Sequence, residues 1–215
     1  MNLNTLDIYL GDEVLDVGSG PNPNPFATVL CDLYIDSDAQ RSNNPLKTDN
    51  KPLVCASIEA LPFRDKAFNF VSACHVLEHT DHPDKACKEL MRVASRGYIE
   101  TPCPWLEQGY WVATEGKSHW EYHKWYVWNP DQSVNAAYTR EIGRKLIFER
   151  KDPLQFDGEN RFGHTIRMMM EDIREHFSKG KTNNDRVNYI MAQFTPSLHA
   201  TIFQWKDSFE VEVRE

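Results

Sequence analysis

The chain has 215 residues, with 24 Lys and Arg against 32 Asp and Glu, which gives a formal net charge of -8. This length suits one domain that can bury a core without a disulfide or a metal. The composition, 40% hydrophobic and 26% charged, excludes a wholly disordered chain, and the acidic excess argues against a nucleic-acid partner.

The N-terminus has no basic patch followed by an apolar core, so we expect no secretory signal. No apolar run approaches the roughly 20 residues of a membrane helix. The five cysteines are odd in number and contain no C-x-x-C pair, which disfavours a disulfide framework or a Cys-rich zinc site and indicates a cytoplasmic location. Three of them lie in apolar runs and are expected to be buried: Cys31, Cys55 and Cys74.

Near-continuous apolar runs in the N-terminal half predict strands covered on both faces, as in a parallel α/β sheet. They are Glu13–Val17, Thr28–Leu33, Pro52–Ala56, Phe68–Cys74 and Gly97–Thr101. Between the last two, Pro83–Ala94 has apolar residues at helical spacing, and Pro83 suits the first turn of a helix. This order predicts a right-handed βαβ crossover.

The C-terminal half is less regular. Cys103–Pro130 is rich in aromatic residues and holds five of the six tryptophans. The remaining predictions are a strand at Lys145–Lys151, a helix at Ile166–Phe177, an exposed loop at Lys179–Asp185, and a hairpin of His199–Trp205 with Phe209–Arg214.

Asp16-x-Gly18-x-Gly20 follows the first predicted strand, where glycines let the backbone approach a ligand closely. In a dinucleotide site a helix would begin here and hold a phosphate. Instead, three alternating prolines run from Pro21 to Pro25, and each would cost about 3 kcal/mol inside a helix. A ligand without phosphate is therefore favoured.

S-adenosylmethionine is such a ligand, because it offers a cationic amino group, a cationic sulfonium and two vicinal ribose hydroxyls. Asp16 could hold the amino group, directly or through water. Asp32, at the end of the second predicted strand, could accept both hydroxyls, with Asp36 as the competing candidate. The structural alternatives are a turn or cap role for Asp16 and a solvated strand end for Asp32.

Three segments in order resemble the class I S-adenosylmethionine-dependent methyltransferases, nearest to the branch that acts on small molecules and on sugar- or lipid-linked substrates. They are EVLDVGSGPNP, CDLY and SIEALPFRDKAFNFVSACHVLEHTDHPDKACKELMRVASRGYIETP, and the resemblance extends over about residues 12–104. The resemblance implies a doubly wound, Rossmann-like α/β fold with a mostly parallel sheet of seven strands, an antiparallel last strand, and the aromatic-rich insertion after strand five. It implies one methyltransferase domain over residues 1–215, with the cofactor-binding half at 12–104 and a substrate-covering insertion, helix and hairpin at 105–215.

The resemblance also implies S-adenosyl-L-methionine as cofactor and assigns its contacts by position in the motifs. The implied cofactor-binding residues are Asp16, Gly18, Gly20, Asp32, Ser57, Ile58, Glu59 and His75. The chain departs from the family pattern at Asn22, which replaces the third glycine, at Ser57, where an acid beside the adenine is usual, and at Asn69, which replaces an acid of the fourth strand. Asn22 and Ser57 motivate one alternative, a cofactor-binding protein without transferase activity.

His75-Val76-Leu77-Glu78-His79 also spells H-x-x-E-H, a zinc peptidase pattern in which two histidines on one helix face bind zinc and the glutamate acts as base. That pattern needs the middle of a long helix, whereas here it follows a strand and precedes Pro83. We therefore interpret His75 and His79 as pocket-lining or capping residues and predict no metal ligand, with a zinc hydrolase as the weaker alternative.

Ser118–Trp128 could form a lid over a small-molecule acceptor, with aromatic rings near the sulfonium. A local hydrophobic core or a homodimer surface is the alternative. His119 and His123 are the candidate catalytic bases, since methyl transfer to oxygen or nitrogen often needs a proton removed near neutral pH. The expected reaction is an in-line displacement that depends chiefly on positioning.

Overall fold

The structure is a computed structural model that describes residues 5–38, 41, 43–104, 106–107, 122–132, 142–151 and 200–215. The predicted helix at Ile166–Phe177, the loop at Lys179–Asp185 and most of the aromatic-rich segment lie outside the described residues. Within the described part, no helix is long and apolar enough to cross a membrane.

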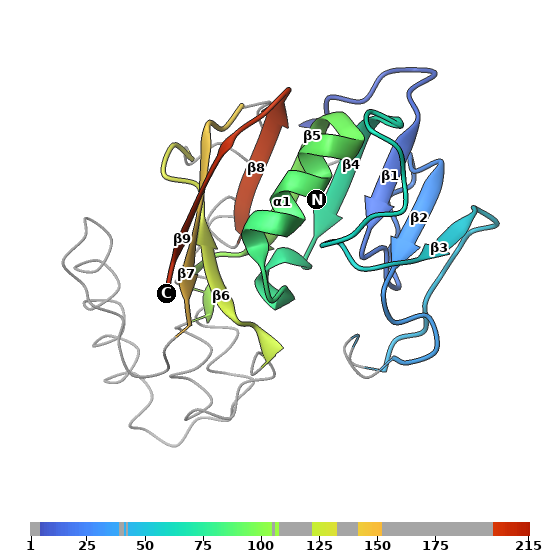
Figure 1. Ribbon diagram of the computed structural model, residues 1–215. Helices are drawn as coiled ribbons and strands as arrows, with labels where there is room; N and C mark the ends of the chain where they lie inside the picture. The colour runs from blue at the N-terminus through green and yellow to red at the C-terminus, as the bar shows by residue number, and fades with distance from the viewer. Residues whose placement is uncertain are drawn as a thin grey trace.

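The main sheet has the order β3-β2-β1-β4-β5-β8. All neighbours up to β5 are parallel, and β8 is antiparallel to β5. Its strands are β1 (Val14–Val17), β2 (Val29–Asp32), β3 (Leu53–Cys55), β4 (Phe68–Cys74), β5 (Ala94–Pro102) and β8 (Ala200–Lys206). The five predicted N-terminal strands are therefore confirmed, and Figure 1 shows the arrowheads of β1, β2 and β4 at the same edge of the sheet.

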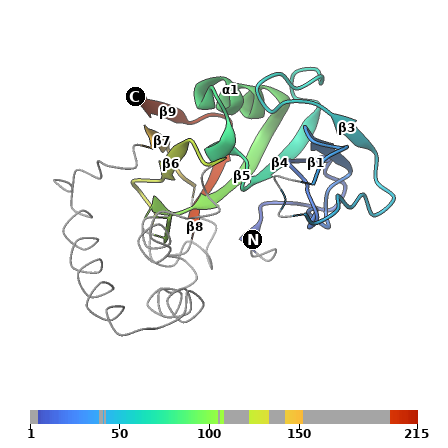
Figure 2. The same cartoon turned by 90° about the horizontal axis from the view of Figure 1, so that it is seen from below.

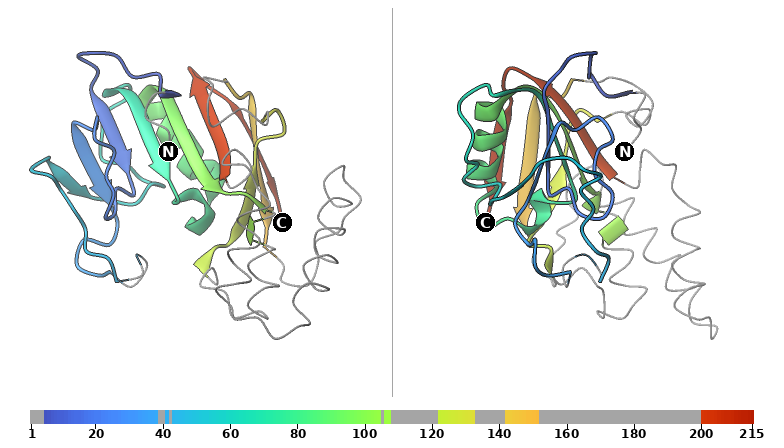
Figure 3. Two further views of the ribbon diagram at one scale, coloured as in Figure 1. Left: turned by 180° about the vertical axis from the view of Figure 1, so that it is seen from behind. Right: turned by 90° about the vertical axis from the view of Figure 1, so that its right-hand side faces the viewer.

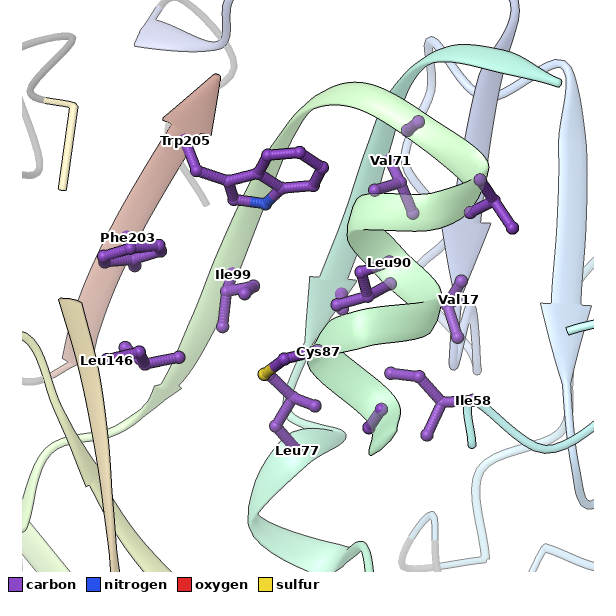
Figure 4. Packing of buried hydrophobic residues seen from close by; sticks show 14 of the residues in the cluster. Val17, Ile58, Val71, Leu77, Cys87, Leu90, Ile99, Leu146, Phe203 and Trp205 are labelled. Atoms are coloured by element: carbon purple, nitrogen blue, oxygen red, sulfur yellow. The ribbon is translucent and has the colours of Figure 1, made fainter. Parts of the chain in front are cut away.

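The helix α1 (Pro83–Val93) joins β4 to β5, as the sequence predicts, and begins with proline in its first turn. It covers one face of the main sheet (Figures 2 and 3). Figure 4 shows Cys87 and Leu90 of the helix close to Val71 and Ile99 of the strands, and all four side chains belong to one buried cluster. Burying a side chain such as Leu90 contributes about 1.5–3 kcal/mol. The helix therefore stabilises the central strands of the main sheet.

A second sheet has the order β6-β7-β9, with β6 antiparallel to β7 and β9 parallel to it. Its strands are β6 (Trp125–Trp128), β7 (Lys145–Arg150) and β9 (Glu210–Arg214). Figure 1 shows it beside β8, and its buried side chains Trp125 and Leu146 share the core cluster with Phe203 of β8 and Leu77. Strand β7 was predicted, whereas β6 lies inside the segment expected to be an insertion.

The predicted C-terminal hairpin is wrong: both strands exist, but β8 pairs with β5 and β9 with β7. The outer edge of β8 is already occupied, because Gly143 donates its backbone N–H to the Gln204 carbonyl at 2.8 Å. Asp207, with φ 64°, turns the chain away between the two strands. The main sheet has six strands in the described part, so the predicted seven-stranded sheet is not confirmed, and the last strand of the chain lies in the second sheet.

All five cysteines are described, and all are free thiols. Cys31 is buried, as predicted, and Cys74 is half-buried. The expectation of burial is wrong for Cys55, which is exposed. The reason is that β3 is the edge strand of the sheet, so the end of this strand lacks a neighbour on one side.

Candidate active site

A cleft of about 1250 Å³ lies at the carboxyl ends of the parallel strands. Open α/β sheets bind their ligands at this edge. All eight predicted cofactor-binding residues line it, from Asp16 to His75, and so does His123. His119, the other predicted base, lies outside the described residues.

The glycine turn after β1 lines the cleft. Gly18 and Gly20 have φ of +67° and +52°, in the left-handed region that glycine adopts without strain. A Cβ on Gly18 would meet the Val76 side chain at 2.1 Å, so only glycine fits there. As the prolines predict, no helix follows: residues 18–28 form turns, and the N–H of Gly18 bonds the Cys31 carbonyl at 2.7 Å.

The Asp16 carboxylate is buried, with 4% of the residue exposed. It accepts one hydrogen bond from the Asn24 backbone N–H at 2.8 Å and another from the Ser72 hydroxyl at 2.7 Å. Burial raises the pKa of Asp16 to about 6, and the two hydrogen bonds oppose this shift. The side chain thus braces the proline-rich turn and also faces the cleft as a carboxylate that a cationic group would stabilise.

Asp32 ends β2 at the cleft and accepts hydrogen bonds from the backbone N–H groups of Gly20 at 3.1 Å and Tyr34 at 3.0 Å. Arg41, which the sequence analysis did not single out, lies 3.4 Å from the same carboxylate and 2.5 Å from Asp38. The competing ribose candidate, Asp36, is exposed and does not line the cleft. Of the two candidate acids, Asp32 alone lines the cleft.

Ser57, Ile58 and Glu59 follow β3 and line the cleft together. The Ser57 hydroxyl accepts the Glu59 backbone N–H at 3.1 Å. One oxygen of the Glu59 carboxylate accepts the backbone N–H groups of Asp81 and His82, at 2.8 and 2.9 Å, just before α1. Glu59 therefore has a structural role at the start of this helix, in addition to its place in the cleft.

His75 follows β4 with a φ of +56°, an unusual conformation for a residue other than glycine. Its ring lies between two carboxylates, 3.5 Å from Glu78 and 3.5 Å from Glu100. Desolvation of the ring opposes protonation, but the two carboxylates prevail and raise the pKa of His75 to about 10. Glu100 also accepts the Tyr98 hydroxyl; burial works against its ionisation, yet His75 and Tyr98 lower its pKa to about 2.

A second group of side chains lies where the turn after β4 meets the start of β6. Glu78 and His79 belong to the short 3-10 helix η3 (Leu77–His79), and His123 comes two residues before β6. The Glu78 side chain is completely buried, and neither carboxylate oxygen has a hydrogen-bond partner among the described residues. His123 bonds the buried carboxylate of Glu107 at 3.0 Å.

Charge and burial set the protonation of this group. Burial opposes ionisation of Glu78, yet the neighbouring His75 holds the pKa of Glu78 below its ordinary value. Burial lowers the pKa of His79, which favours the neutral imidazole. The long helix that the zinc peptidase pattern needs is not formed, because a positive φ at His75 and a single 3-10 turn replace it.

One family model and several solved structures match part of the chain. Residues 15–99 match the family model of the methyltransferase domain. This match confirms the resemblance to S-adenosylmethionine-dependent methyltransferases that the sequence predicts over this part of the chain, and the family implies S-adenosyl-L-methionine as the cofactor. No curated protein matches the chain.

Several solved structures are similar. The [4+2]-cyclase SpnF is 22% identical over 42% of this chain and 39% of its own, with a TM-score of 0.32. The PH0226 protein of Pyrococcus horikoshii is 19% identical over 42% and 49%, with a TM-score of 0.34. An S-adenosylmethionine-dependent methyltransferase of Thermotoga maritima is 14% identical over 45% and 47%, with a TM-score of 0.35. The chain spans less than half of each of these structures.

Proposed function

We propose that the protein transfers a methyl group from S-adenosylmethionine to a small-molecule, sugar- or lipid-linked acceptor. The observation that carries this proposal is the cleft at the strand ends, where the glycine turn, Asp16 and Asp32 lie together. When bound, the cofactor supplies an electrophilic methyl group whose leaving group is a neutral thioether, so no leaving-group protonation is needed. The work of the protein is then binding, orientation and exclusion of water.

The cleft residues fit the cofactor in three respects. Gly18 and Gly20 present backbone without side chains along the cleft, which is the close approach that a ligand lying over the turn would need. Asp32 has its carboxylate fixed by two backbone N–H groups and could accept the ribose hydroxyls. Asp16 places a buried carboxylate where a cationic amino group would lower its pKa, which favours binding above pH 6.

The order of the strands orients the ligand. Residues after β2 and β3 line one end of the cleft, whereas His79 and residues 122–124 line the other end, beyond β4. With ribose at Asp32, the reactive sulfonium would face the β4 and β5 side, so the acceptor would enter between η3 and β6. Because methyl acceptors often lose a proton, His123 stays the sequence-based candidate for a base in this region.

Calorimetry with S-adenosylhomocysteine tests the cofactor site. Asp32→Ala should weaken binding at least tenfold, about 1.4 kcal/mol, whereas Asp36→Ala is the matched control and should bind like the wild type. Equal loss in both variants, or none in either, would overturn the site. Binding without any methyl transfer across acceptor classes would favour the alternative, a cofactor-binding protein without transferase activity.

A further inference from the structure

The buried carboxylate of Glu78 and two imidazoles converge at the acceptor end of the cleft. One oxygen of Glu78 and one ring nitrogen each from His79 and His123 all lie within 4.8 Å of one another. The two rings meet edge to face, with centroids 4.6 Å apart. Carboxylate oxygen and imidazole nitrogen are ligand types that divalent transition metals prefer.

Glu78 supplies a second, independent observation. Its side chain is 0% exposed, and its two oxygens lack hydrogen-bond donors in the described part of the chain. The nearest cationic candidate is the half-exposed His75 ring, whose Nδ1 lies 3.5 Å away. A buried carboxylate is costly unless it is paired or coordinates a metal. His75 supplies one partner at 3.5 Å without hydrogen-bond geometry, and a cation between the two imidazoles would supply a second.

The hydrogen bonds of the two imidazoles orient them as ligands. His79 Nδ1 lies 3.3 Å from the Tyr122 carbonyl oxygen, which can only accept, so Nδ1 carries the proton and Nε2 the lone pair. His123 Nδ1 lies 3.0 Å from the Glu107 carboxylate, and the same reasoning places its lone pair on Nε2. A carboxylate behind a histidine is the usual outer partner of a metal-ligating imidazole.

The backbone holds the two ligand segments together. Lys124 donates its N–H to the Glu78 carbonyl at 2.7 Å, and the Trp125 indole donates to the Thr80 carbonyl at 2.8 Å. Lys124 also forms an ion pair with Asp81 at 2.6 Å. These bonds join the turn that holds Glu78 and His79 to the segment that follows His123. The backbone therefore keeps the three proposed ligands near one another.

We propose that Glu78, His79 and His123 bind a divalent transition metal, with Zn²⁺ as the fitting ion and Glu107 as the positioning residue for His123. Three ligands from the described residues leave a fourth tetrahedral position, and His79 and His123 both line the cleft. The site differs from the zinc peptidase alternative, because Glu78 is a ligand rather than a base and His75 is not a ligand. Metal binding and the base role of His123 exclude each other, since both use the same lone pair.

The test uses the untagged full chain after removal of metal with a chelator. Zinc is titrated into this protein by calorimetry, and elemental analysis then gives the amount of zinc bound per chain. We expect one zinc per chain. When Co²⁺ replaces Zn²⁺, the wild type should show the intense visible absorption of a tetrahedral cobalt site. This measurement tests the site in the wild-type protein without any substitution. Glu78→Gln and His123→Ala should each lose stoichiometric zinc, whereas Glu107→Gln should keep it with an affinity roughly 10–100-fold weaker.

His75→Ala is the matched control, because His75 contacts the same carboxylate but is not a proposed ligand. It should keep one zinc per chain. Absence of zinc and of the cobalt spectrum in the wild type would overturn the proposal, as would equal zinc loss in His75→Ala and His123→Ala. Binding of S-adenosylhomocysteine is measured on the same samples without metal, so failure of the metal site and failure of the proposed function are distinguished.

Discussion

Asp16 on β1 and Ser72 on β4 lie side by side on neighbouring parallel strands, and the Ser72 hydroxyl donates a 2.7 Å hydrogen bond to the Asp16 carboxylate. Asn24 donates its side-chain amide to the same hydroxyl oxygen at 3.0 Å. The three residues join the two central strands to the proline-rich turn. Because the network contains one carboxylate with a raised pKa, its contribution to stability depends on pH.

We expect Asp16 to contribute a fall in the free energy of unfolding as pH rises from about 4 to 6. In that interval Asp16 is ionised in the unfolded chain but still protonated in the folded one, whose pKa is about 6. At this side chain the folded state therefore binds more protons, and a shift of about two units corresponds to about 3 kcal/mol. Urea unfolding between pH 4 and 7.5 measures this as the difference between the wild type and Asp16→Asn, because carboxyls with lowered pKa values, such as Glu100, act in the opposite direction in both proteins.

The matched control is Asp36→Asn, which changes an exposed carboxyl outside the cleft and should retain the wild-type profile. Ser72→Ala should destabilise the protein more at pH 7 than at pH 4, since a hydrogen bond to a charged group contributes about 1.5–3 kcal/mol. A wild-type profile in Asp16→Asn would contradict the assignment of the pH dependence to Asp16.

Gly18→Ala should destabilise the protein by about 2–3 kcal/mol, because the new Cβ combines a positive φ with a clash. The clash is with Val76, whose Cγ2 would lie 2.1 Å away. Val76→Ala removes that atom, so in the Val76→Ala background the Gly18→Ala change should no longer cause the clash and should cost only the backbone strain, about 1 kcal/mol. Thermal unfolding of the four proteins in this cycle gives the coupling. Additive losses would show that the two residues do not meet.

Strands β1 to β5 could be predicted because each is an apolar run bounded by turn residues, and Phe68–Cys74 is confirmed to the residue. The pairing of β9 could not, since it depends on which edges remain open after Gly143 has bonded to β8. Asp16 and Asp32 could be predicted as cleft residues, because the glycine motif marks the edge of the sheet where their strands end. The approach of His123 to Glu78 was not, because it is a contact between distant segments that only the packing of β6 creates.

If Asp32 accepts the ribose hydroxyls as proposed, Arg41 competes with them. Its guanidinium lies 3.4 Å from Asp32 Oδ1, which also accepts the Tyr34 N–H, so a hydroxyl bound to this oxygen would weaken the ion pair. Arg41→Ala should therefore strengthen binding of S-adenosylhomocysteine by about threefold, roughly 0.6 kcal/mol. Calorimetry checks this, with Asp38→Ala as the matched variant that releases Arg41 from its other carboxylate. Weaker binding in Arg41→Ala would instead make Arg41 a ligand-binding residue.

Glu59 offers a test that separates a structural role from a cofactor role. Its carboxylate accepts the N–H groups of Asp81 and His82 at the start of α1, where negative charge is favourable. Glu59→Ala removes both bonds and should cost about 1–2 kcal/mol of stability, while Glu59→Gln retains an acceptor oxygen and should cost about half as much. Denaturant unfolding measures both variants.

Binding of S-adenosylhomocysteine, measured well below the unfolding temperature, decides what the carboxylate does in the cleft. If Glu59 acts through the helix start, affinity should stay within about twofold of the wild type in Glu59→Gln, which corresponds to less than about 0.5 kcal/mol. If its charge contacts the ligand, affinity should fall tenfold or more while stability is nearly unchanged. The two bonds to backbone N–H groups favour the first outcome, because one oxygen of the carboxylate is already committed to both.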